Sequence, residues 1–242
     1  PMIKFFRKIR QKMLTENKFS KYLIYAIGEI VLVVIGILIA LSINNWNEET
    51  KNNAKSVNYI NRLITDISKD TTTINTQIRQ GVKYEKIYKG YFEFIKQGNI
   101  KPEHLKDSID EFPQNWEMLD FTQTTYNELI SSGNFDVINE KKRIALIEYY
   151  DLSEAFKNMI NDRKNLVVKE DIESKKYLDA QTIIPSNFYK SINYIPSEAY
   201  IAQGLKHRHN AIEMNYEIIY TFKILGPMFD EKAKKTIAIL KE

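Results

Sequence analysis

The chain contains no cysteine among its 242 residues, and its only histidines are His104, His207 and His209. Without cysteine there is no thiol nucleophile, thiolate metal ligand or disulfide. His207 and His209 lie two apart on a predicted helix, so they point in different directions. Glu213 follows His209 by four residues, but two ligands on one face fall short of the three or four protein ligands of a zinc site. We therefore expect no metal and no other cofactor.

Familiar catalytic motifs are also missing from the sequence. There is no serine-hydrolase, Walker, Rossmann or zincin signature, so we expect that the protein is not an enzyme. The lack of cysteine does not identify a compartment, because exported domains without disulfides and many cytosolic proteins both fit it.

Long apolar runs are absent except for one, which extends from Tyr22 to Trp46. Its centre, Ile30 to Leu41, contains no polar side chain. A helix needs about 20 residues to cross the hydrocarbon core of a bilayer, and this run supplies them. Tyr22 and Tyr25 lie at one end and Trp46 at the other, where amphipathic rings favour the headgroup zone. The sequence therefore predicts one transmembrane helix over residues 22–46, with residues 47–242 on one side of the membrane.

A cleaved signal peptide is the alternative interpretation of this run. Ala40 and Ser42 are small residues with the spacing of a cleavage site, and the charged start resembles an n-region. However, the apolar core of a signal peptide is about 7 to 15 residues long, whereas this run is longer and ends in an aromatic anchor. We therefore favour an uncleaved anchor.

The segment before the run is strongly basic. Against the single acidic residue Glu16 it carries seven basic residues, which gives a net charge of +6: Lys4, Arg7, Lys8, Arg10, Lys12, Lys18 and Lys21. Short basic flanks remain in the cytoplasm. We therefore expect a cytoplasmic N-terminus and an exported C-terminal domain.

This flank also accounts for the positive net charge of the whole chain. The chain has 35 basic and 31 acidic residues, so that acidic residues are in slight excess once the flank and Glu29 are set aside. Nucleic-acid binding requires a basic face on the folded domain. We therefore exclude nucleic acid as a partner and expect the flank to attract anionic lipid headgroups.

Within residues 1–21, apolar side chains recur at helical spacing, as expected for an amphipathic helix at the membrane interface. They are Ile3, Phe6, Ile9 and Met13. The basic residues Lys4, Arg7, Lys8, Arg10 and Lys12 occupy much of the remainder and are the predicted headgroup contacts. An ordinary positive-inside flank with a few apolar residues explains the pattern equally well.

Glu29 is the one carboxylate inside the predicted span. At the centre of a bilayer a carboxylate costs roughly 2.5 to 3.5 kcal/mol, and less towards the interface, so it usually faces a partner or water. Gly36, Ala26 and Ala40 lie close to the same helix face, and small residues allow another helix to approach. We favour a helix contact in which Glu29 is protonated or paired with a cation. The alternative is a glutamate that reaches the cytoplasmic interface beside a flank lysine.

Residues 47–242 read as helical nearly throughout, without a strand pattern or an internal repeat. Apolar residues recur every three or four positions at Val57, Ile60, Ile64, Ile67, Ile74 and Ile78, and again at Tyr88, Phe92 and Ile95. This spacing predicts a long helix with one apolar seam. Its register extends back to Trp46, so the helix is either continuous with the membrane span or broken near Asn52 and Asn53.

Capping and breaking residues divide the rest of the chain. Gly98 and Asn99 end the first long helix, and a short helix is expected from Pro102 to Glu111. Asn139 begins a helix of more than thirty residues. Pro185 to Pro196 is a predicted loop.

The last helical region opens at Ser197 and has a kink or break at Gly226 and Pro227. Three long helices and one shorter helix then pack as an antiparallel bundle, the usual arrangement for helices joined by short connections. The predicted fold class is therefore all-α, with a single N-terminal transmembrane helix followed by a helical-bundle domain.

Several blocks of the sequence resemble a family of uncharacterised membrane-anchored proteins from Bacteroidota. They are Met2-Ile-Lys-Phe-Phe-Arg-Lys-Ile-Arg, Asn17-Lys-Phe-Ser-Lys-Tyr, Ala26-Ile-Gly-Glu-Ile, Val33-Val-Ile-Gly-Ile-Leu-Ile-Ala-Leu, Asn44-Asn-Trp-Asn-Glu and, further on, Glu128-Leu-Ile-Ser-Ser-Gly-Asn-Phe-Asp-Val-Ile-Asn. The resemblance implies a periplasmic location for residues 47–242 in a bacterial inner membrane protein. The family has no assigned activity, so no catalytic residue follows from it.

Two functions fit these observations. The first is a non-catalytic subunit or scaffold, which self-associates or binds a larger membrane or periplasmic protein complex. The second is a ligand-binding, sensor-like helical domain. Such a domain would have to act through a partner protein, because the predicted cytoplasmic segment is too short to be an effector.

Overall fold

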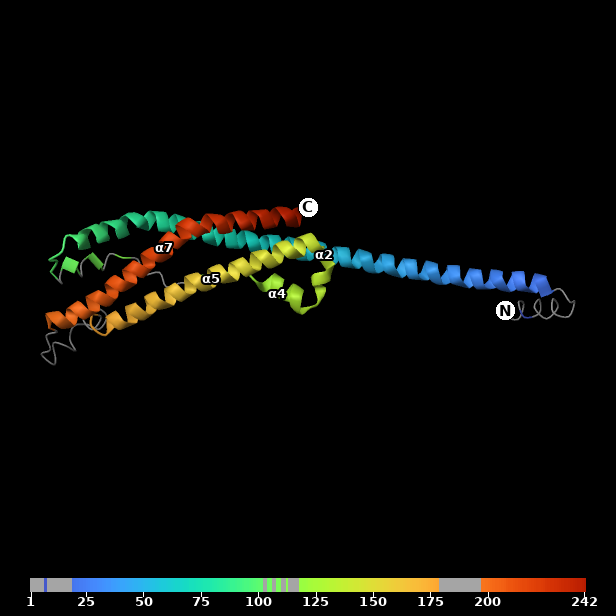
Figure 1. Ribbon diagram of the computed structural model, residues 1–242, viewed down its shortest axis with the longest axis horizontal. Helices are drawn as coiled ribbons and strands as arrows, with labels where there is room; N and C mark the ends of the chain where they lie inside the picture. The colour runs from blue at the N-terminus through green and yellow to red at the C-terminus, as the bar shows by residue number, and fades with distance from the viewer. Residues whose placement is uncertain are drawn as a thin grey trace. The chain divides into compact units, whose positions relative to one another are not determined.

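The computed structural model describes residues 19–101, 118–178 and 197–242, together with Arg7, His104, Leu105, Ser108, Ile109 and Phe112, although not the side chains of residues 19–22. Its elements are α2 (Phe19–Lys96), α4 (Thr124–Ser131), the 3-10 helix η1 (Asn134–Val137), α5 (Glu140–Lys175) and α7 (Glu198–Lys241) (Figure 1). The described residues contain no strand, and the predicted all-α class is confirmed.

The chain divides into two compact units, Pro1–Val57 and Asn58–Glu242. The helix α2 crosses the boundary between them, and it has no break at Asn52 or Asn53. Within the polar stretch of α2, the Thr50 hydroxyl donates to the Trp46 carbonyl at 2.8 Å. The continuous helix, one of the two alternatives predicted from the sequence, is therefore confirmed.

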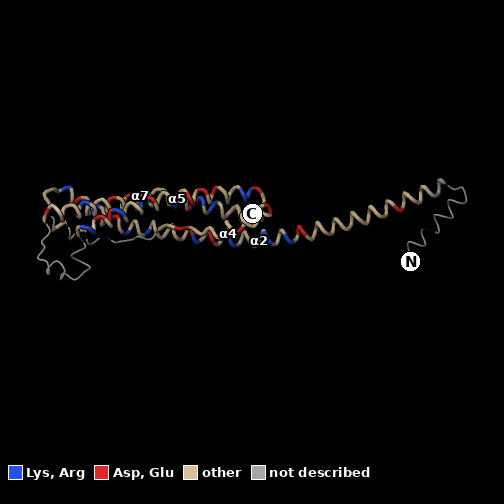
Figure 2. The backbone as a smooth tube through the Cα atoms, turned by 90° about the horizontal axis from the view of Figure 1, so that it is seen from below, with Lys and Arg blue, Asp and Glu red and all other residues tan. Residues whose placement is uncertain are grey.

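The first unit contains the apolar part of α2. An 18-residue window of this helix has a mean hydropathy of 2.8, and none of that window is buried. The corresponding part of the chain in Figure 2 is almost free of charged residues. Among the described residues, this helix is long enough and apolar enough to cross a membrane. A signal sequence meets the same test of length and composition.

In the second unit the three long helices do not all alternate in direction. Asp70 of α2 accepts from Tyr149 near the start of α5, and further along the two helices Gln77 and Lys164 line one cavity. These contacts show that α2 and α5 run parallel. The helix α7 runs antiparallel to α2, because Asn75 contacts Asp230 of α7 and Tyr91, further along α2, contacts His209, which lies earlier in α7.

The predicted antiparallel arrangement is therefore wrong for α2 and α5. The physical reason is the connection between them, which is not a short turn. The chain returns alongside both helices: the Leu119 amide donates to Asn161 of α5, and the Thr122 amide donates to Asp70 of α2. It thereby returns to the end of the unit at which this part of α2 begins, and α5 starts from there (Figure 1).

The predicted helix ends are confirmed where they can be compared. After α2, Gly98 and Asn99 adopt positive φ angles of 66° and 52°, which end a helix. Asn139 caps α5 by accepting from the Lys142 amide at 2.9 Å. Ser197 caps α7 by accepting from the Tyr200 amide at 3.2 Å. The predicted loop Pro185 to Pro196 and most of the short helix after Pro102 lie outside the described residues.

Two apolar clusters form the core of the second unit. The larger one contains residues of α2, α4, α5 and α7, among them Leu63, Tyr149 and Phe222. The smaller one surrounds Tyr88 and Leu205. The buried face of α2 departs in part from the predicted seam. Val57 is 59% exposed, whereas Tyr59, Leu63, Asp66, Ile67, Asp70 and Ile74 are buried. The face is wider than one stripe because α2 packs on α4, α5 and α7 together.

Glycine permits close approach at three places in this unit. A Cβ atom at Gly81 would lie 3.0 Å from Ile219, and one at Gly226 would lie 2.8 Å from Ile78. Gly204 is the tightest, with 2.6 Å to Leu178 and 2.7 Å to the Cβ of Tyr177. These distances are shorter than normal carbon contacts.

Pro227 lies next to the second of these glycines, and α7 continues through it. Figure 1 shows a change of direction of α7 in this region. A proline inside a helix removes one hydrogen bond and bends the axis. Of the two predicted alternatives at Gly226 and Pro227, the kink is therefore the one observed.

We predict that Gly204→Ala destabilises the protein by about 1 to 3 kcal/mol, because the new methyl group meets the Cβ atom of Tyr177, which cannot move without the backbone. The matched control is Gly90→Ala. Gly90 also lies inside a helix but has nothing within 4 Å, so alanine should stabilise by up to about 1 kcal/mol. Urea unfolding of the full chain in mild detergent, followed by circular dichroism, measures both. Equal effects would contradict the packing argument.

Candidate functional site

The residues predicted to form a membrane-helix contact lie in the first unit. Ala26 and Glu29 are half-buried, and Gly36 and Ala40 are exposed. At 3.6 residues per turn these four positions fall on one side of α2. A contact between Glu29, Gly36 and a second helix stays a prediction.

The predicted interface anchors and headgroup contacts are only partly described. Tyr25 is half-buried and Trp46 is 70% exposed, while the side chain of Tyr22 is outside the description. Of the five predicted headgroup contacts, Arg7 is helical and exposed. The other four, Lys4, Lys8, Arg10 and Lys12, lie outside the described residues.

The glycines of the first unit differ from the close-approach glycines of the second. A Cβ atom at Gly28 or Gly36 would meet nothing within 4 Å. Gly90, in the second unit, is also open, and it borders a hollow of about 340 Å³ beside Tyr91 and Phe112. No contact among the described residues therefore accounts for glycine at Gly36.

The histidines of α7 are held apart, as their spacing predicted. His207 contacts Glu170 of α5 at 2.8 Å, whereas His209 contacts the hydroxyl of Tyr91 on α2 at 2.9 Å. Glu213 lies 3.3 Å from His209. Among the described residues there is no group of three or more side chains able to share a metal ion.

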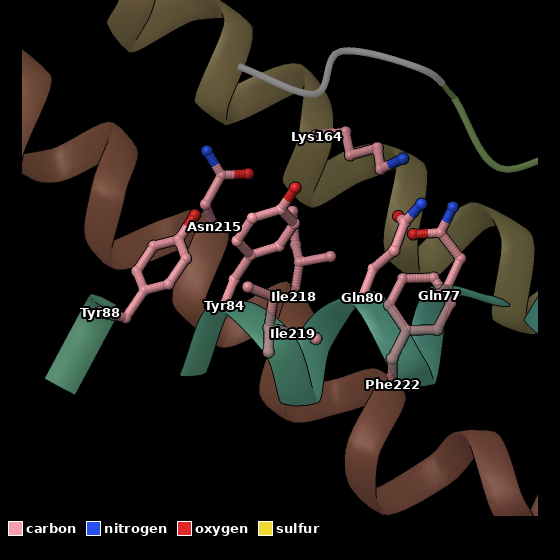
Figure 3. Close-up of a pocket in the computed structure, with 10 residues that line it drawn as sticks. Gln77, Gln80, Tyr84, Tyr88, Lys164, Asn215, Ile218, Ile219 and Phe222 are labelled. Atoms are coloured by element: carbon pink, nitrogen blue, oxygen red, sulfur yellow. The ribbon is translucent and has the colours of Figure 1, made fainter. Parts of the chain in front are cut away.

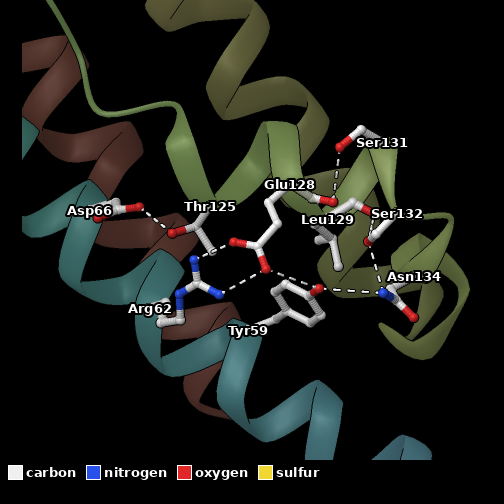
Figure 4. A network of polar contacts seen from close by, with 9 residues as sticks. All are labelled: Tyr59, Arg62, Asp66, Thr125, Glu128, Leu129, Ser131, Ser132 and Asn134. Atoms are coloured by element: carbon white, nitrogen blue, oxygen red, sulfur yellow. Dashed lines mark hydrogen bonds and ion pairs between the residues drawn. The ribbon is translucent and has the colours of Figure 1, made fainter.

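A cluster of polar contacts joins α4 to α2 (Figure 4). Both oxygens of the Glu128 carboxylate accept from the Arg62 guanidinium, at 3.1 Å and 2.5 Å. The hydrogen bond from Arg62 lowers the pKa of Glu128 below its ordinary value. The Tyr59 hydroxyl donates to Glu128 and accepts from the Asn134 amide, both at 3.3 Å.

This cluster gives a structural role to the stretch Glu128 to Asn139 that resembles a family element. Glu128 attaches the stretch to α2, and Leu129 is fully buried beneath it. Gly133 turns the chain with a φ angle of 69°, which glycine adopts without strain. Asn139 then caps α5. The stretch therefore determines where α5 begins.

Two buried carboxylates on α2 lie next to this cluster. Asp66 accepts from the Thr125 hydroxyl at 2.5 Å, and Asp70 accepts from the Thr122 amide at 2.9 Å and from the Tyr149 hydroxyl at 2.8 Å. Burial raises the pKa of Asp70 from 3.8 to about 6, against the effect of these hydrogen bonds.

Sequence reasoning missed this pair of carboxylates. The available signal was their spacing of four residues beside Leu63 and Ile67, which places both on the apolar side of a helix. The pair explains how α2 holds the returning chain, since each carboxylate accepts a hydrogen bond from it.

A separate cavity of about 210 Å³ lies between α2, α5 and α7 (Figure 3). Its described lining combines an apolar wall with amide, phenol and ammonium groups: Gln77, Gln80, Gly81, Tyr84, Tyr88, Lys164, Asn215, Ile218, Ile219 and Phe222. Burial raises the pKa of Tyr88 to about 12, so its hydroxyl keeps its proton at neutral pH. Nothing in the sequence predicted this cavity, because its residues come from three distant segments.

The model of a family of unknown function, DUF6090, matches residues 29–170, which is more than half of the chain, and the chain therefore belongs to this family. The matched region begins at Glu29 and includes the whole stretch Glu128 to Asn139. No curated protein and no solved structure matches the chain.

We predict that Asp70 makes the stability of the second unit depend on pH. Its folded-state pKa is raised, so its protonated form contributes stability fully below about pH 3.8, and this contribution is lost as the pH rises through about 6. This pKa difference of about two corresponds to about 3 kcal/mol in the free energy of unfolding. Between pH 4 and pH 7, the free energy of unfolding of Asp70→Asn should therefore rise relative to that of the parent by up to this amount.

Urea unfolding at each pH measures this difference. Asn keeps an oxygen that accepts from Thr122, while its amide group can donate to the hydroxyl of Tyr149. The control is Asp162→Asn, at an exposed position of α5, which gives the effect of removing one carboxylate from the surface of the domain. A constant difference between Asp70→Asn and the parent would show that Asp70 has an ordinary pKa.

Proposed function

We propose that this member of the DUF6090 family is a non-catalytic, membrane-anchored subunit or scaffold. The span of residues 22–46 holds it in a bacterial inner membrane, in keeping with the expected Bacteroidota lineage, and its helical domain lies in the periplasm. It acts by self-association or by binding a membrane or periplasmic protein.

The observation that carries this proposal is the open glycine Gly36. Glycine inside a helix is less favourable than alanine by about 1 kcal/mol. In the second unit, Gly81, Gly204 and Gly226 each occupy a point of close approach. Gly36 has no such neighbour among the described residues, and it lies in an exposed apolar helix. A second helix that packs against this face would supply the missing contact.

The neighbours of Gly36 are consistent with such a contact. Ala40 lies one turn further along the same side and is also small and exposed. In membranes, small residues spaced by four let two helices approach closely. Glu29 lies about two turns before Gly36. Its polar interactions would be strong in an apolar medium, whether it acts as a protonated hydrogen-bond donor or as the partner of a cation.

The orientation follows from charge. The net charge of the segment before the span is +6, with Glu16 opposing seven basic residues, and a short basic segment resists transfer across the membrane. The cytoplasmic part would hold residues 1–21, with basic side chains against anionic headgroups.

We predict that protease added to spheroplasts digests the domain after Trp46 and spares an epitope tag placed at Met2, because the tag lies in the cytoplasm. Immunoblots against the tag and against the domain give the result. Permeabilised cells, in which both should be digested, serve as the control. A protected domain with a cleaved tag would reverse the topology, and loss of the tagged fragment before protease is added would indicate a cleaved signal sequence.

We further predict that Gly36→Leu and Ala40→Leu each reduce self-association or recovery of a partner at least about tenfold, since a large side chain prevents close helix approach. Ser42→Leu is the matched control: it also replaces a small, exposed residue by leucine, but on a different side of the helix. Crosslinking in native membranes, followed by purification in mild detergent, measures assembly.

Glu29→Gln separates the two roles of the carboxylate. Glutamine still donates and accepts hydrogen bonds, so assembly should persist if Glu29 acts in its protonated form and should fall if it pairs with a cation. The domain should stay folded in every variant, because its core lies outside the span. Assembly that is equal in Gly36→Leu, Ala40→Leu and Ser42→Leu would contradict the proposal.

A further inference from the structure

The cavity near Lys164 lies where the two apolar clusters of the second unit meet. Phe222 and Ile218 belong to the larger cluster, whereas Tyr88 and Ile219 belong to the smaller one. All four side chains line the cavity. A continuous helical core would fill this place with apolar side chains. Here the core is instead interrupted by a polar hollow.

Lys164 is the reason for the interruption on α5. It occupies a position between Ile160 and Val167 on the buried face of this helix and is only 6% exposed. A buried ammonium group loses its hydration, and this loss amounts to several kcal/mol unless polar or negative groups surround it. The protein therefore surrounds such a lysine with polar groups, and the amides of Gln77 and Gln80 line the same cavity.

Figure 3 shows how the polar groups are distributed. The ammonium group of Lys164 and the amides of Gln77 and Gln80 lie towards one end of the cavity. Asn215 and the hydroxyl of Tyr88 lie towards the other end. Gln80 is exposed, whereas Lys164 is buried.

The wall between these ends is apolar, with Ile218, Ile219 and Phe222 all contributed by α7. Flat or branched hydrocarbon groups bind to such a wall, because contact with it removes apolar surface from water. The volume of about 210 Å³ is below the roughly 300 to 1,000 Å³ of sites for drug-sized ligands. The occupant is therefore small.

The charge of the lining selects the polar group of the ligand. Among the described residues that line the cavity, Lys164 is the basic side chain and none is acidic. An ammonium group has three N–H donors, so Lys164 can hold a neighbouring protein group and a ligand oxygen together. A singly charged carboxylate is easier to bury beside one ammonium group than a doubly charged phosphate, because less charge is removed from water.

We propose that this cavity binds a small monocarboxylate with an apolar body. The carboxylate accepts hydrogen bonds from Lys164 and from the side-chain amides of Gln77 and Gln80, and the apolar body lies against Phe222. Asn215 and Tyr88 can hold a further polar group at the far end. This site is independent of the helix contact proposed for the membrane span, because all its residues belong to the second unit.

Benzoate and benzamide are suitable probes, because they have nearly the same shape and differ in charge. The full chain in mild detergent is titrated with each compound, and binding is followed by saturation-transfer NMR with empty micelles as the blank. Benzoate should bind at least about tenfold more tightly than benzamide, since hydrogen bonds to charged groups are the stronger ones.

Variants of the lining locate the site. Lys164→Met keeps the length of the side chain and should weaken the binding of benzoate at least about tenfold. Lys169→Met, at an exposed position of the same helix, should leave benzoate binding unchanged. Gln80→Glu keeps the shape of an exposed side chain, so it should preserve the fold. It should weaken the binding of benzoate through repulsion between like charges, whereas Gln80→Lys should strengthen that binding.

The two variants Gln80→Glu and Gln80→Lys still test the proposal if Lys164→Met does not fold. Equal binding of benzoate and benzamide would overturn the proposal, as would benzoate binding that is the same in the parent, Gln80→Glu and Gln80→Lys. Absence of benzoate binding to the parent chain would also overturn it.

Discussion

The architecture of the second unit depends on the two buried carboxylates of α2. Asp66 and Asp70 are removed from water, so each must find hydrogen-bond donors inside the protein. The donors are supplied by the returning chain, through Thr122 and Thr125, and by Tyr149 of α5. The Arg62–Glu128 pair extends this attachment towards the surface. Because α4 is held there, α5 starts beside α2 and runs parallel to it, and α7 packs antiparallel against α2.

The use of glycine connects the fold with the proposed function. Where α7 meets α2 and the end of α5, glycine removes a side chain that would overlap with its neighbour, as at Gly204 and Gly226. The same residue type at Gly36 occupies an exposed apolar helix, where no neighbour is described. At Gly36, glycine would let a second helix approach in the same way within a membrane, where close packing replaces the hydrophobic effect as the driving force.

The cavity near Lys164 and the membrane-helix face support different kinds of interaction. The first would take a small molecule, and the second would take a protein helix. The cavity also gives a location to the ligand-binding function that the sequence left as its alternative. A ligand there would contact α2, α5 and α7 together, so its binding would stabilise the packing of all three helices by linkage between binding and folding.

The sequence by itself determined the features that depend on near neighbours in the chain. The all-α class, the long apolar helix, the caps at Asn139 and Ser197 and the stop at Gly98 all follow from residues within a few positions of one another. The separation of His207 and His209 follows from helix geometry in the same way. The sequence also singled out the stretch from Glu128 to Asn139 by resemblance, although without a structural role.

Only the tertiary structure decided the direction of α5, the pairing of Arg62 with Glu128, and the cavity near Lys164. Each of these depends on side chains that are far apart in the chain, and local spacing carries no information about which distant segment will lie opposite. The buried carboxylates illustrate the reason. Asp66 and Asp70 look unfavourable on an apolar helix face until the donors that satisfy them, Thr122, Thr125 and Tyr149, are brought beside them by the fold.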